Sequence, residues 1–533
     1  MATMRWISAG ICALTLALPA LAQDPKPGDY YEDKTDLGFK VKMPARWESI
    51  PPAPDDGNLI IKYDPRSTKS VQLGPNSQLD LHAWIVKFDR RKGDAPKEKD
   101  KDKADRMYVS KAKNLADWVK ANVGTGFKSE GPKELEVAKV PAVETIFLNE
   151  SKDKDKGKNV RLYSMLYKLH PEVDVAVVFI APGEDKKWSK YVNDFRAMAK
   201  SFKTVAAESA KPVLAEGASL RDRTRAELQD KVSRQGDWKL YETPNYFIVS
   251  SIDDKPFLDE LKGRLEAIRA IYEQDYPASK VAEIRAEAAR LATGAKKDEK
   301  KEGGEEDEEE GEGEEPSEAP PDDLAKAMEA SRCSIVRICK NREQYQSYGG
   351  PGGSAGYWSS NARELVLYDD KADGGRNDTW IVLNHEAFHQ YIFYFYGNIA
   401  PHSWYNEGTG DFYSGYMYKN GRFTLKENPW RKETIKAAIR DENFVPLKDI
   451  FRYKQSDYYA NPSICYAQGW SMIYFLRTGK KNNAKGWDPR WDTLLDDYLK
   501  VLAATGKPEQ AIEQCLTGID VDALQAAWID YTK

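Results

Sequence analysis

The segment His385-Glu386-Ala387-Phe388-His389 brings together residue types that bind metal ions and move protons. On a helix with about 3.6 residues per turn, the two histidines lie on one face, about 6 Å apart along the axis, so both imidazoles can bind one zinc ion. Glu386 is turned by about 100° from His385, where it can hold a water molecule beside the metal as general base. The spacing therefore predicts a hydrolytic zinc site, although two histidines on a buried helix face would show the same pattern.

A third metal ligand is expected from the segment that follows. Glu407 and Asp411 lie one turn apart on a second predicted helix, for which Ser403 is a suitable N-cap. Glu407 can complete a site of two histidines and one carboxylate, which leaves a fourth position for water. Asp411 is then placed to accept a hydrogen bond from the other ring nitrogen of a ligating histidine.

Start and stop signals for a helix surround the histidine pair. Asn377-Asp378-Thr379-Trp380 supplies an N-cap, and residues 380–396 contain neither proline nor glycine before Gly397. Residues 365–368 form a predicted strand directly ahead of this helix, and we expect this strand to pair as a sheet edge with an extended substrate. Further on, Asn420-Gly421 predicts a hairpin.

This arrangement resembles the gluzincin superfamily, which includes thermolysin and the aminopeptidase N family, and within it the peptidase-MA-like domains of secreted bacterial proteins. The matching ligand, base, ligand and ligand positions are His385, Glu386, His389 and Glu407, and Asn406-Glu407 followed by Asp411 resembles the thermolysin-type Asn-Glu-x-x-x-Asp pattern. The resemblance implies a zinc-dependent metallopeptidase that hydrolyses peptide bonds of a peptide or protein substrate, with Glu386 activating a zinc-bound water. The Gly-x-Met-Glu-Asn signature of aminopeptidases is absent, so the resemblance does not extend to exopeptidase action.

Tyr466, at the start of a later predicted helix, is the candidate for stabilising the oxyanion, because the resemblance implies a tyrosine or histidine in that role. Packing in the core would also explain this tyrosine. His402 is close to Glu407 in the sequence and is interpreted as a bystander. Two other functions stay open: a catalytically inactive, zinc-stabilised peptidase fold that acts as a binding or scaffold module, and another zinc hydrolase such as a deacylase.

Residues 1–22 have the form of a secretory signal peptide, with Arg5, an apolar run and small residues before Gln23. We expect cleavage after Ala22 and a secreted or periplasmic protein without a stable membrane span, because the apolar run is too short to cross a bilayer. The net charge of -5 provides no basic field, so nucleic-acid binding is not expected. The oligomeric state stays open.

The rest of the chain is predicted to be α+β. Residues 23–204 contain short strands and a late helix, which predicts an antiparallel sheet with helices, and they weakly resemble PsbP-like domains. Residues 205–237 are a polar connecting segment. Residues 238–533 are expected to form a gluzincin metallopeptidase-like domain, thermolysin-like in having a small sheet and a mostly helical C-terminal part. Within it, residues 294–323 are an acidic insertion that is predicted to be disordered.

The cysteines of the chain could form disulfides in an exported protein. Once Cys12 leaves with the signal peptide, the remaining cysteines are Cys333, Cys339, Cys465 and Cys515. In an oxidising compartment their pairing is open among three arrangements. If residues 334–338 form a strand, Cys333 and Cys339 lie about 20 Å apart, which disfavours that pair.

Overall fold

The computed structural model describes residues 25–33, 37–53, 56–65, 71–74, 77–79, 81–91, 112–149, 160–183, 185–206, 217–299, 324–371, 375–397 and 399–533. The chain divides into two compact units, Met1–Lys211 and Pro212–Lys533. Both combine helices with antiparallel strand pairs, which confirms the α+β prediction. The signal peptide predicted for residues 1–22 lies outside the described residues. In the described part, no helix combines the length and the apolar character that crossing a membrane requires.

The first unit is built on a seven-stranded antiparallel sheet. In spatial order its strands are β3 (Trp47–Ile50), β4 (Leu59–Pro65), β7 (Ala83–Asp89), β11 (Val173–Pro182), β10 (Val160–His170), β9 (Val140–Asn149) and β8 (Phe127–Val137). A three-stranded sheet and a short hairpin accompany it, formed by β1 (Pro27–Asp33), β2 (Phe39–Pro44) and β12 (Lys203–Thr204), and by β5 (Val71–Gly74) and β6 (Ser77–Leu79).

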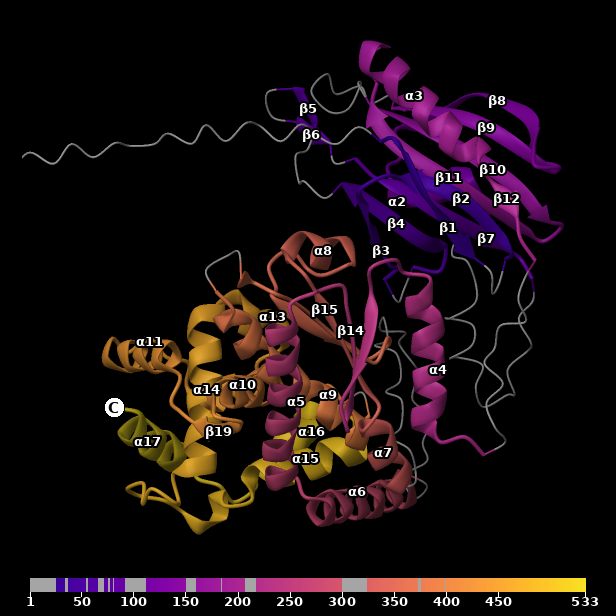
Figure 1. Ribbon diagram of the computed structural model, residues 1–533. Helices are drawn as coiled ribbons and strands as arrows, with labels where there is room; N and C mark the ends of the chain where they lie inside the picture. The colour runs from indigo at the N-terminus through magenta and orange to yellow at the C-terminus, as the bar shows by residue number, and fades with distance from the viewer. Residues whose placement is uncertain are drawn as a thin grey trace, which may run out of the picture. The chain divides into compact units, whose positions relative to one another are not determined.

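Two helices cover opposite faces of the seven-stranded sheet. α3 (Asp185–Lys200) lies across one face (Figure 1), where Phe195 stacks on Phe179 with ring centroids 4.6 Å apart. α2 (Leu115–Asn122) packs on the other face through the buried Trp118. Because both faces are covered, the central strands bury nearly every side chain, and this unit has a core of its own.

The second unit contains a five-stranded sheet. In spatial order its strands are β13 (Lys239–Glu242), β14 (Tyr246–Ser250), β15 (Ser334–Cys339), β17 (Glu364–Tyr368) and β16 (Gly356–Ser359). β14, β15 and β17 run parallel, whereas β13 and β16 run antiparallel to their neighbours at the two edges. The prediction that residues 365–368 provide the edge for a substrate is therefore wrong. β17 is paired on both sides, and β16 holds the edge position.

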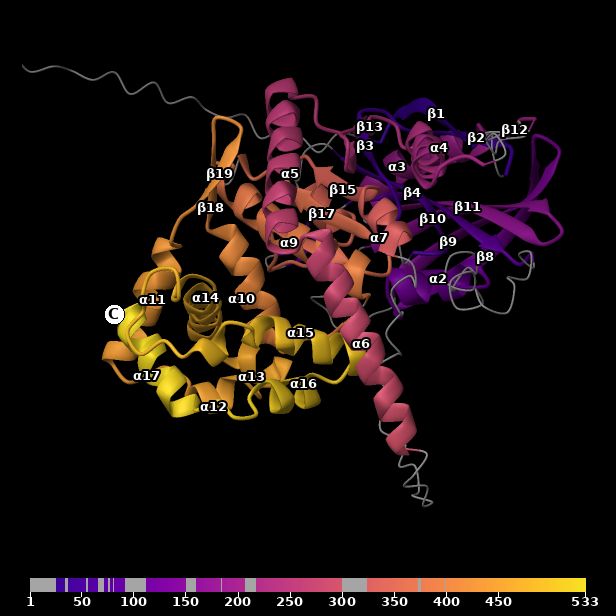
Figure 2. The ribbon, with the colours of Figure 1, turned by 90° about the horizontal axis from the view of Figure 1, so that it is seen from below.

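Two long helices cover one face of this sheet, and the second of them carries the histidines of the candidate site. α5 (Lys255–Asp275) and α9 (Asn377–Tyr396) pack against each other, with the rings of Phe257 and Trp380 stacked at a centroid distance of 5.2 Å. The hairpin of β18 (Tyr416–Lys419) and β19 (Arg422–Leu425) lies beside α5 (Figure 2). Its turn residues have the positive φ angles typical of the predicted Asn-Gly turn, 53° at Asn420 and 77° at Gly421.

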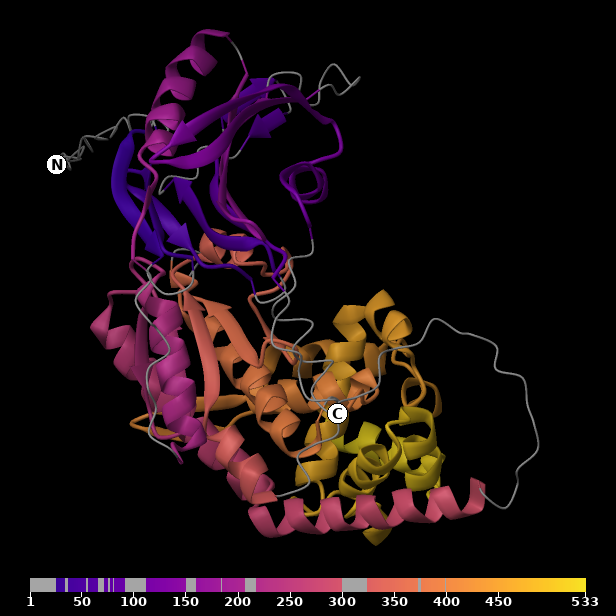
Figure 3. The same ribbon diagram turned by 90° about the vertical axis from the view of Figure 1, so that its right-hand side faces the viewer.

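The C-terminal part of the second unit is helical, and α6 (Ala278–Glu299) lies against one of its helices, α15 (Leu494–Thr505) (Figure 3). Lys280 and Asp496 join these two helices by an ion pair of 2.9 Å. The remaining helices of the unit are α4 (Leu220–Ser233), α7 (Leu324–Ser331), α8 (Arg342–Ser347), α10 (Ser403–Ser414), α11 (Pro429–Arg440), α12 (Leu447–Ile450), α13 (Gln455–Ala460), α14 (Pro462–Thr478), α16 (Pro508–Cys515) and α17 (Val521–Thr532).

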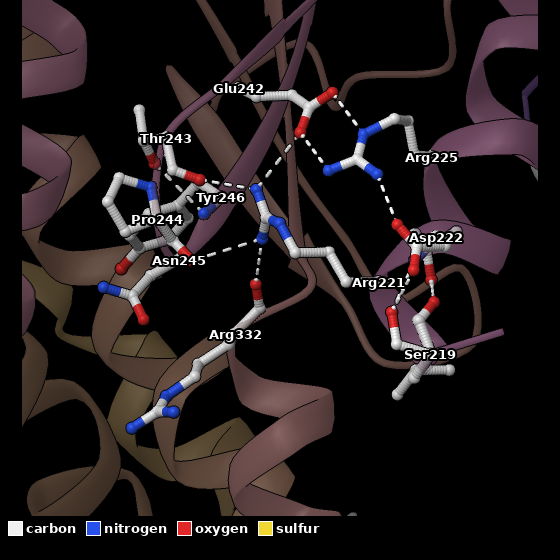
Figure 4. Close-up of polar contacts among 12 residues, drawn as sticks. Ser219, Arg221, Asp222, Arg225, Glu242, Thr243, Pro244, Asn245, Tyr246 and Arg332 are labelled. Atoms are coloured by element: carbon white, nitrogen blue, oxygen red, sulfur yellow. Dashed lines mark hydrogen bonds and ion pairs between the residues drawn. The ribbon is translucent and has the colours of Figure 1, made fainter.

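α4 is bonded to the sheet of the second unit (Figure 4), although the sequence placed it in a connecting segment. The Arg221 guanidinium donates to the Thr243 carbonyl at 2.6 Å and to the Arg332 carbonyl at 2.7 Å. One turn further, Arg225 donates two hydrogen bonds to Glu242, of 2.7 and 2.9 Å. The helix therefore belongs to the structure of the second unit.

The first residues of α9 and α10 and the last residue of α6 differ from the helix ends that the sequence predicted. Asn377 is the first residue of α9 and Arg376 occupies the N-cap position without a side-chain cap, while His402, rather than Ser403, precedes α10. α6 continues to Glu299, so residues 294–299 of the predicted insertion are helical, and residues 300–323 lie outside the described residues. The four cysteines that remain beyond the predicted signal peptide are free thiols.

Candidate metal centre

α9 presents His385 and His389 one turn apart, with ring centroids 4.9 Å apart and ring planes inclined by 71°. The opposite side of the helix is fixed in the core, where Leu383 is fully buried and the Tyr272 hydroxyl donates to the Asn384 carbonyl at 2.6 Å. The two imidazoles are thus carried by a helix whose position is set by the sheet and by α5.

α10 brings Glu407 to the histidine pair. Glu407 Oε2 lies 3.3 Å from His385 Nε2, and one potential ligand atom from each of His385, His389 and Glu407 lies within 4.8 Å of the others. This close approach depends on Gly410, because a Cβ at that position would lie 2.6 Å from the His385 ring. The three residues, called the metal group below, could hold a metal ion.

Further polar residues orient the metal group. Asp411 Oδ1 lies 3.3 Å from His385 Nδ1, and Asp411 Oδ2 forms an ion pair of 2.8 Å with Arg431 Nε. The Tyr459 hydroxyl donates to Glu407 Oε1 at 3.1 Å. An acceptor at Nδ1 favours the tautomer of His385 in which Nε2 is the metal-binding atom.

Electrostatics also favour a cation at the metal group. Burial lowers the pKa of His389 to about 3, so its imidazole is neutral, which is the form that binds metals. Burial by itself raises the pKa of Glu407, but the hydrogen bond with His385, the charges of the two histidines and the hydrogen bond with Tyr459 together outweigh it and lower the pKa to about 2. Burial by itself lowers the pKa of His385, yet Asp411 and Glu407 raise it well above its ordinary value. A metal ion would therefore compete with a proton at His385.

The donor set fits a zinc ion. Two imidazoles and one carboxylate are the ligands of many catalytic zinc sites, in which a fourth position is left for water. Within the described part of the chain, His389 has ring contacts with His385 and Phe388 but no hydrogen-bond partner for its ring nitrogens, so a donor atom is available. The three residues predicted as ligands thus lie together as a group that could hold a metal ion.

Glu386 lies beside the metal group and is held by the sheet. The Trp358 N–H donates to Glu386 Oε2 at 3.0 Å. Burial, with help from the negative charge of Glu407, raises the pKa of Glu386 to about 7, against the opposing effect of His385. A carboxylate with a pKa near neutrality can both accept and release a proton under neutral conditions, as a general acid–base catalyst must.

A cleft of about 340 Å³ opens onto the metal group and Glu386. Its walls include Tyr357 and Trp358 of β16 and residues of the second half of α9. Between α9 and α10, Gly397, Ile399 and Pro401 also line it. Along the outer edge of β16, the Ser354 hydroxyl bonds both the N–H and the carbonyl of Gly356. Because Trp358 N–H is bonded to Glu386, two residues of this edge already have partners within the chain.

The structure brings most of the predicted site residues together. Of the predicted residues, His385, Glu386, His389 and Glu407 line the cleft, and Asp411 contacts His385 Nδ1 from outside the lining. Tyr466 of α14 lies next to Tyr459, with ring centroids 6.1 Å apart, and burial together with the nearby Glu407 raises its pKa. His402 does not line the cleft, because its ring contacts the Tyr498 hydroxyl at 3.0 Å.

Three supporting residues were missed by sequence reasoning, namely Trp358, Arg431 and Tyr459. They come from β16, α11 and α13, which reach the metal group only through tertiary packing, so no spacing rule connects them to the histidines. For Tyr459 a local signal exists in the pair Tyr458-Tyr459 shortly before Tyr466.

Comparison with known proteins gives only weak matches. No family model and no curated protein matches the chain. Among solved structures, CyanoP, the cyanobacterial PsbP protein of Synechocystis sp. PCC 6803, matches the N-terminal region with 10% sequence identity and a TM-score of 0.23, covering 36% of this chain and 98% of that chain. A protein of unknown function from Pseudomonas aeruginosa matches with 14% identity and a TM-score of 0.16, covering 32% of this chain and 95% of that one. Likenesses of this strength assign neither a family nor an activity.

Proposed function

We propose that the protein is a zinc-dependent metallopeptidase of the gluzincin type. In this proposal His385, His389 and Glu407 hold the zinc ion, Asp411 orients His385, and Glu386 is the general base. The observation that carries the proposal is that the metal group, with ligand atoms within 4.8 Å of one another, shares one cleft with a carboxyl whose pKa is about 7.

When bound, zinc supplies Lewis-acid polarisation of the scissile carbonyl and makes water more acidic. Glu386 accepts the proton of the attacking water and passes it to the leaving amine, with Trp358 N–H holding the carboxylate in place. Tyr466 is the candidate for donating a hydrogen bond to the oxyanion. Its phenol has a raised pKa, mainly through burial, which keeps it protonated as a donor.

The proposed substrate is a peptide or protein segment that enters the cleft along β16. An edge strand can bind an extended peptide by main-chain hydrogen bonds, and β16 stands at the edge of the sheet beside Glu386. The signal-peptide pattern of residues 1–22 supports a secreted or periplasmic location for this activity.

The decisive experiment measures zinc content and hydrolysis together in the purified full chain. We expect about one zinc per chain in the wild type, loss of zinc in His389→Ala, and retention in His402→Ala, since His402 bonds Tyr498 instead. Glu386→Gln should keep zinc but lose hydrolysis of an unfolded protein by at least about a hundredfold, because the general base is removed.

Each alternative has its own outcome in this experiment. Zinc binding without turnover in either the wild type or Glu386→Gln would support an inactive, zinc-stabilised binding or scaffold module. Turnover of acyl substrates but not peptides would support another zinc hydrolase, such as a deacylase. Unchanged peptide hydrolysis in Glu386→Gln would contradict the role given to Glu386.

A further inference from the structure

The two carboxylate oxygens of Glu407 have different neighbours. Oε2 lies 3.3 Å from His385 Nε2, whereas Oε1 accepts a hydrogen bond of 3.1 Å from the Tyr459 hydroxyl. The side-chain amide of Asn406 also approaches Oε1, at 3.5 Å. One oxygen of Glu407 therefore faces the histidines, while the other is held by neighbouring side chains.

This difference matters because a carboxylate can bind a metal ion through one oxygen or through both. A catalytic zinc site needs a position for water in addition to its three protein ligands. If Glu407 used both oxygens, the second oxygen would crowd that position. A hydrogen bond to Oε1 opposes such binding, because the metal ion would have to replace it.

Tyr459 is held in place through its neighbour in the sequence. Both Tyr458 and Tyr459 belong to α13, and Tyr458 is fully buried. The Tyr458 hydroxyl packs against α14 so closely that a Cβ at Gly469 would lie only 2.5 Å from it. Tyr458 thus anchors α13, and α13 presents the Tyr459 hydroxyl to Glu407.

The hydrogen bond from Tyr459 meets a need of Glu407, whose side chain is only 13% exposed. A carboxylate oxygen with so little access to water requires a donor from the protein. A hydrogen bond to a charged carboxylate is also stronger than one between neutral groups. Because Tyr459 is 40% exposed, loss of its hydroxyl should change the surroundings of Glu407 more than the packing of the core.

We propose that Tyr459 is a positioning residue whose hydroxyl occupies Oε1 of Glu407, so that Glu407 offers only Oε2 to the metal ion and a position stays free for water. The inference rests on the proposed function, because it assumes that the metal group holds a zinc ion. It goes further by giving the two tyrosines beside the site different roles. Tyr459 is bonded to a metal ligand, and Tyr466 remains the candidate for the oxyanion.

Cobalt(II) in place of zinc tests this role, because the visible absorption of cobalt weakens as the number of its ligands rises. We expect the cobalt-loaded full chain with Tyr459→Phe to absorb more weakly than the wild type, since Glu407 can then bind through both oxygens. For the zinc-loaded variant, kcat on a peptide substrate should fall at least about tenfold with KM nearly unchanged, the loss typical when the partner of a metal ligand is removed.

Tyr458→Phe is the matched control. It removes the same hydroxyl from the adjacent residue, and among the residues that the structure describes the Tyr458 hydroxyl has no hydrogen-bond partner. Its cobalt spectrum and kcat should equal those of the wild type. Replacing Tyr459 by 4-aminophenylalanine, which keeps an N–H donor in the place of the hydroxyl, should restore the wild-type spectrum.

Each further outcome separates this inference from the proposed function. A cobalt spectrum of Tyr459→Phe identical to that of the wild type would overturn the inference, and so would the same spectral change in Tyr458→Phe. A wild type that binds neither cobalt nor zinc would overturn both proposals. A weakened spectrum in Tyr459→Phe, together with a wild type that hydrolyses no peptide, would support the positioning role and contradict only the peptidase function.

Discussion

Gly410 sets the distance between α10 and His385, because any side chain at this position would meet the imidazole. We predict that Gly410→Ala lowers zinc affinity at least about tenfold, the effect expected when the surroundings of a metal ligand are displaced. The ring cannot move aside freely, since Asp411 and Glu407 contact its two nitrogens, each at 3.3 Å. Competition with a chelator of known affinity measures the change.

Gly352→Ala is the matched control for this substitution. The atom nearest to a Cβ at Gly352 is Gln346 Nε2, at 3.8 Å, so the added methyl group meets no obstacle. Circular dichroism establishes that both variants are folded. An unchanged zinc affinity in folded Gly410→Ala would contradict the claim that the close approach of α10 is needed.

At the residue scale, the sequence predicts the side chains that share a helix better than those that meet through packing. The spacing of His385 and His389 is a property of α9 alone and followed from local periodicity. Glu407 lies on α10, and the resemblance to gluzincins, rather than periodicity, implied that it would meet the two histidines. Trp358 and Tyr459 reach the site from a strand and a helix that are distant in the sequence. Their roles depend on tertiary contacts that no local pattern records.

At the scale of elements, the edge of the five-stranded sheet was predicted at the wrong strand, at residues 365–368 instead of β16. β17 has five buried residues in a row and reads as a strand, but such burial is typical of an internal strand. β16 is only four residues long and follows a glycine-rich segment, so it has no apolar run to reveal it. The order of strands in a sheet is decided by long-range pairing, and this is why a strand could be predicted while its place could not.

The Ser354 side chain occupies main-chain hydrogen-bonding groups at the outer edge of β16. Its hydroxyl bonds the N–H and the carbonyl of Gly356, so an extended peptide that pairs with β16 must first displace it. We expect Ser354→Ala to lower KM for a peptide substrate by about threefold, the equivalent of less than one net hydrogen bond, with kcat nearly unchanged. Steady-state kinetics on one fluorogenic peptide measure both constants.

Ser354→Thr serves as the control for that experiment, because it keeps the hydroxyl and should retain the wild-type KM. A Ser354→Ala variant with the same KM as the wild type would mean that the substrate does not pair with the edge of β16 at Gly356.

At the scale of the whole molecule, the start of the second unit could not be predicted from the sequence. The composition of residues 205–237 indicates a connection, yet α4 is held to β13 and to the end of α7 by Arg221 and Arg225. A polar helix was predictable here, but its attachment was not, because arginine–carbonyl contacts at large sequence separation leave no periodic pattern.

The Arg225–Glu242 pair makes the attachment of α4 dependent on pH. The hydrogen bonds from Arg225 lower the pKa of Glu242, against the effect of burial. Its contribution to stability is therefore present above the pKa of the unfolded chain, about 4.3, and is lost as pH falls through the lower folded value. Since the Glu242 side chain is 31% exposed, we expect only about 1 kcal/mol.

Glu242→Gln tests this expectation. The wild type should be more stable than the variant at neutral pH, and the difference should disappear at acidic pH in urea unfolding followed by fluorescence. A difference that stays constant with pH would mean that the charge of Glu242 does not attach α4.

Truncation of the chain tests whether α4 is part of the second unit or only connects the two units. A fragment of residues 212–533 keeps the contacts of Arg221 with the Thr243 and Arg332 carbonyls, whereas a fragment of residues 238–533 loses them. Charged hydrogen bonds of this kind contribute about 1.5–3 kcal/mol each, so the shorter fragment should melt roughly 5–10 °C lower.

Arg221→Ala in the longer fragment should reproduce part of this loss, while Arg223→Ala on the same helix provides the matched control. Zinc content should be the same in both fragments wherever they are folded, since the metal group lies on α9 and α10. Equal melting temperatures for the two fragments would show that α4 is a connection and that the second unit begins at β13.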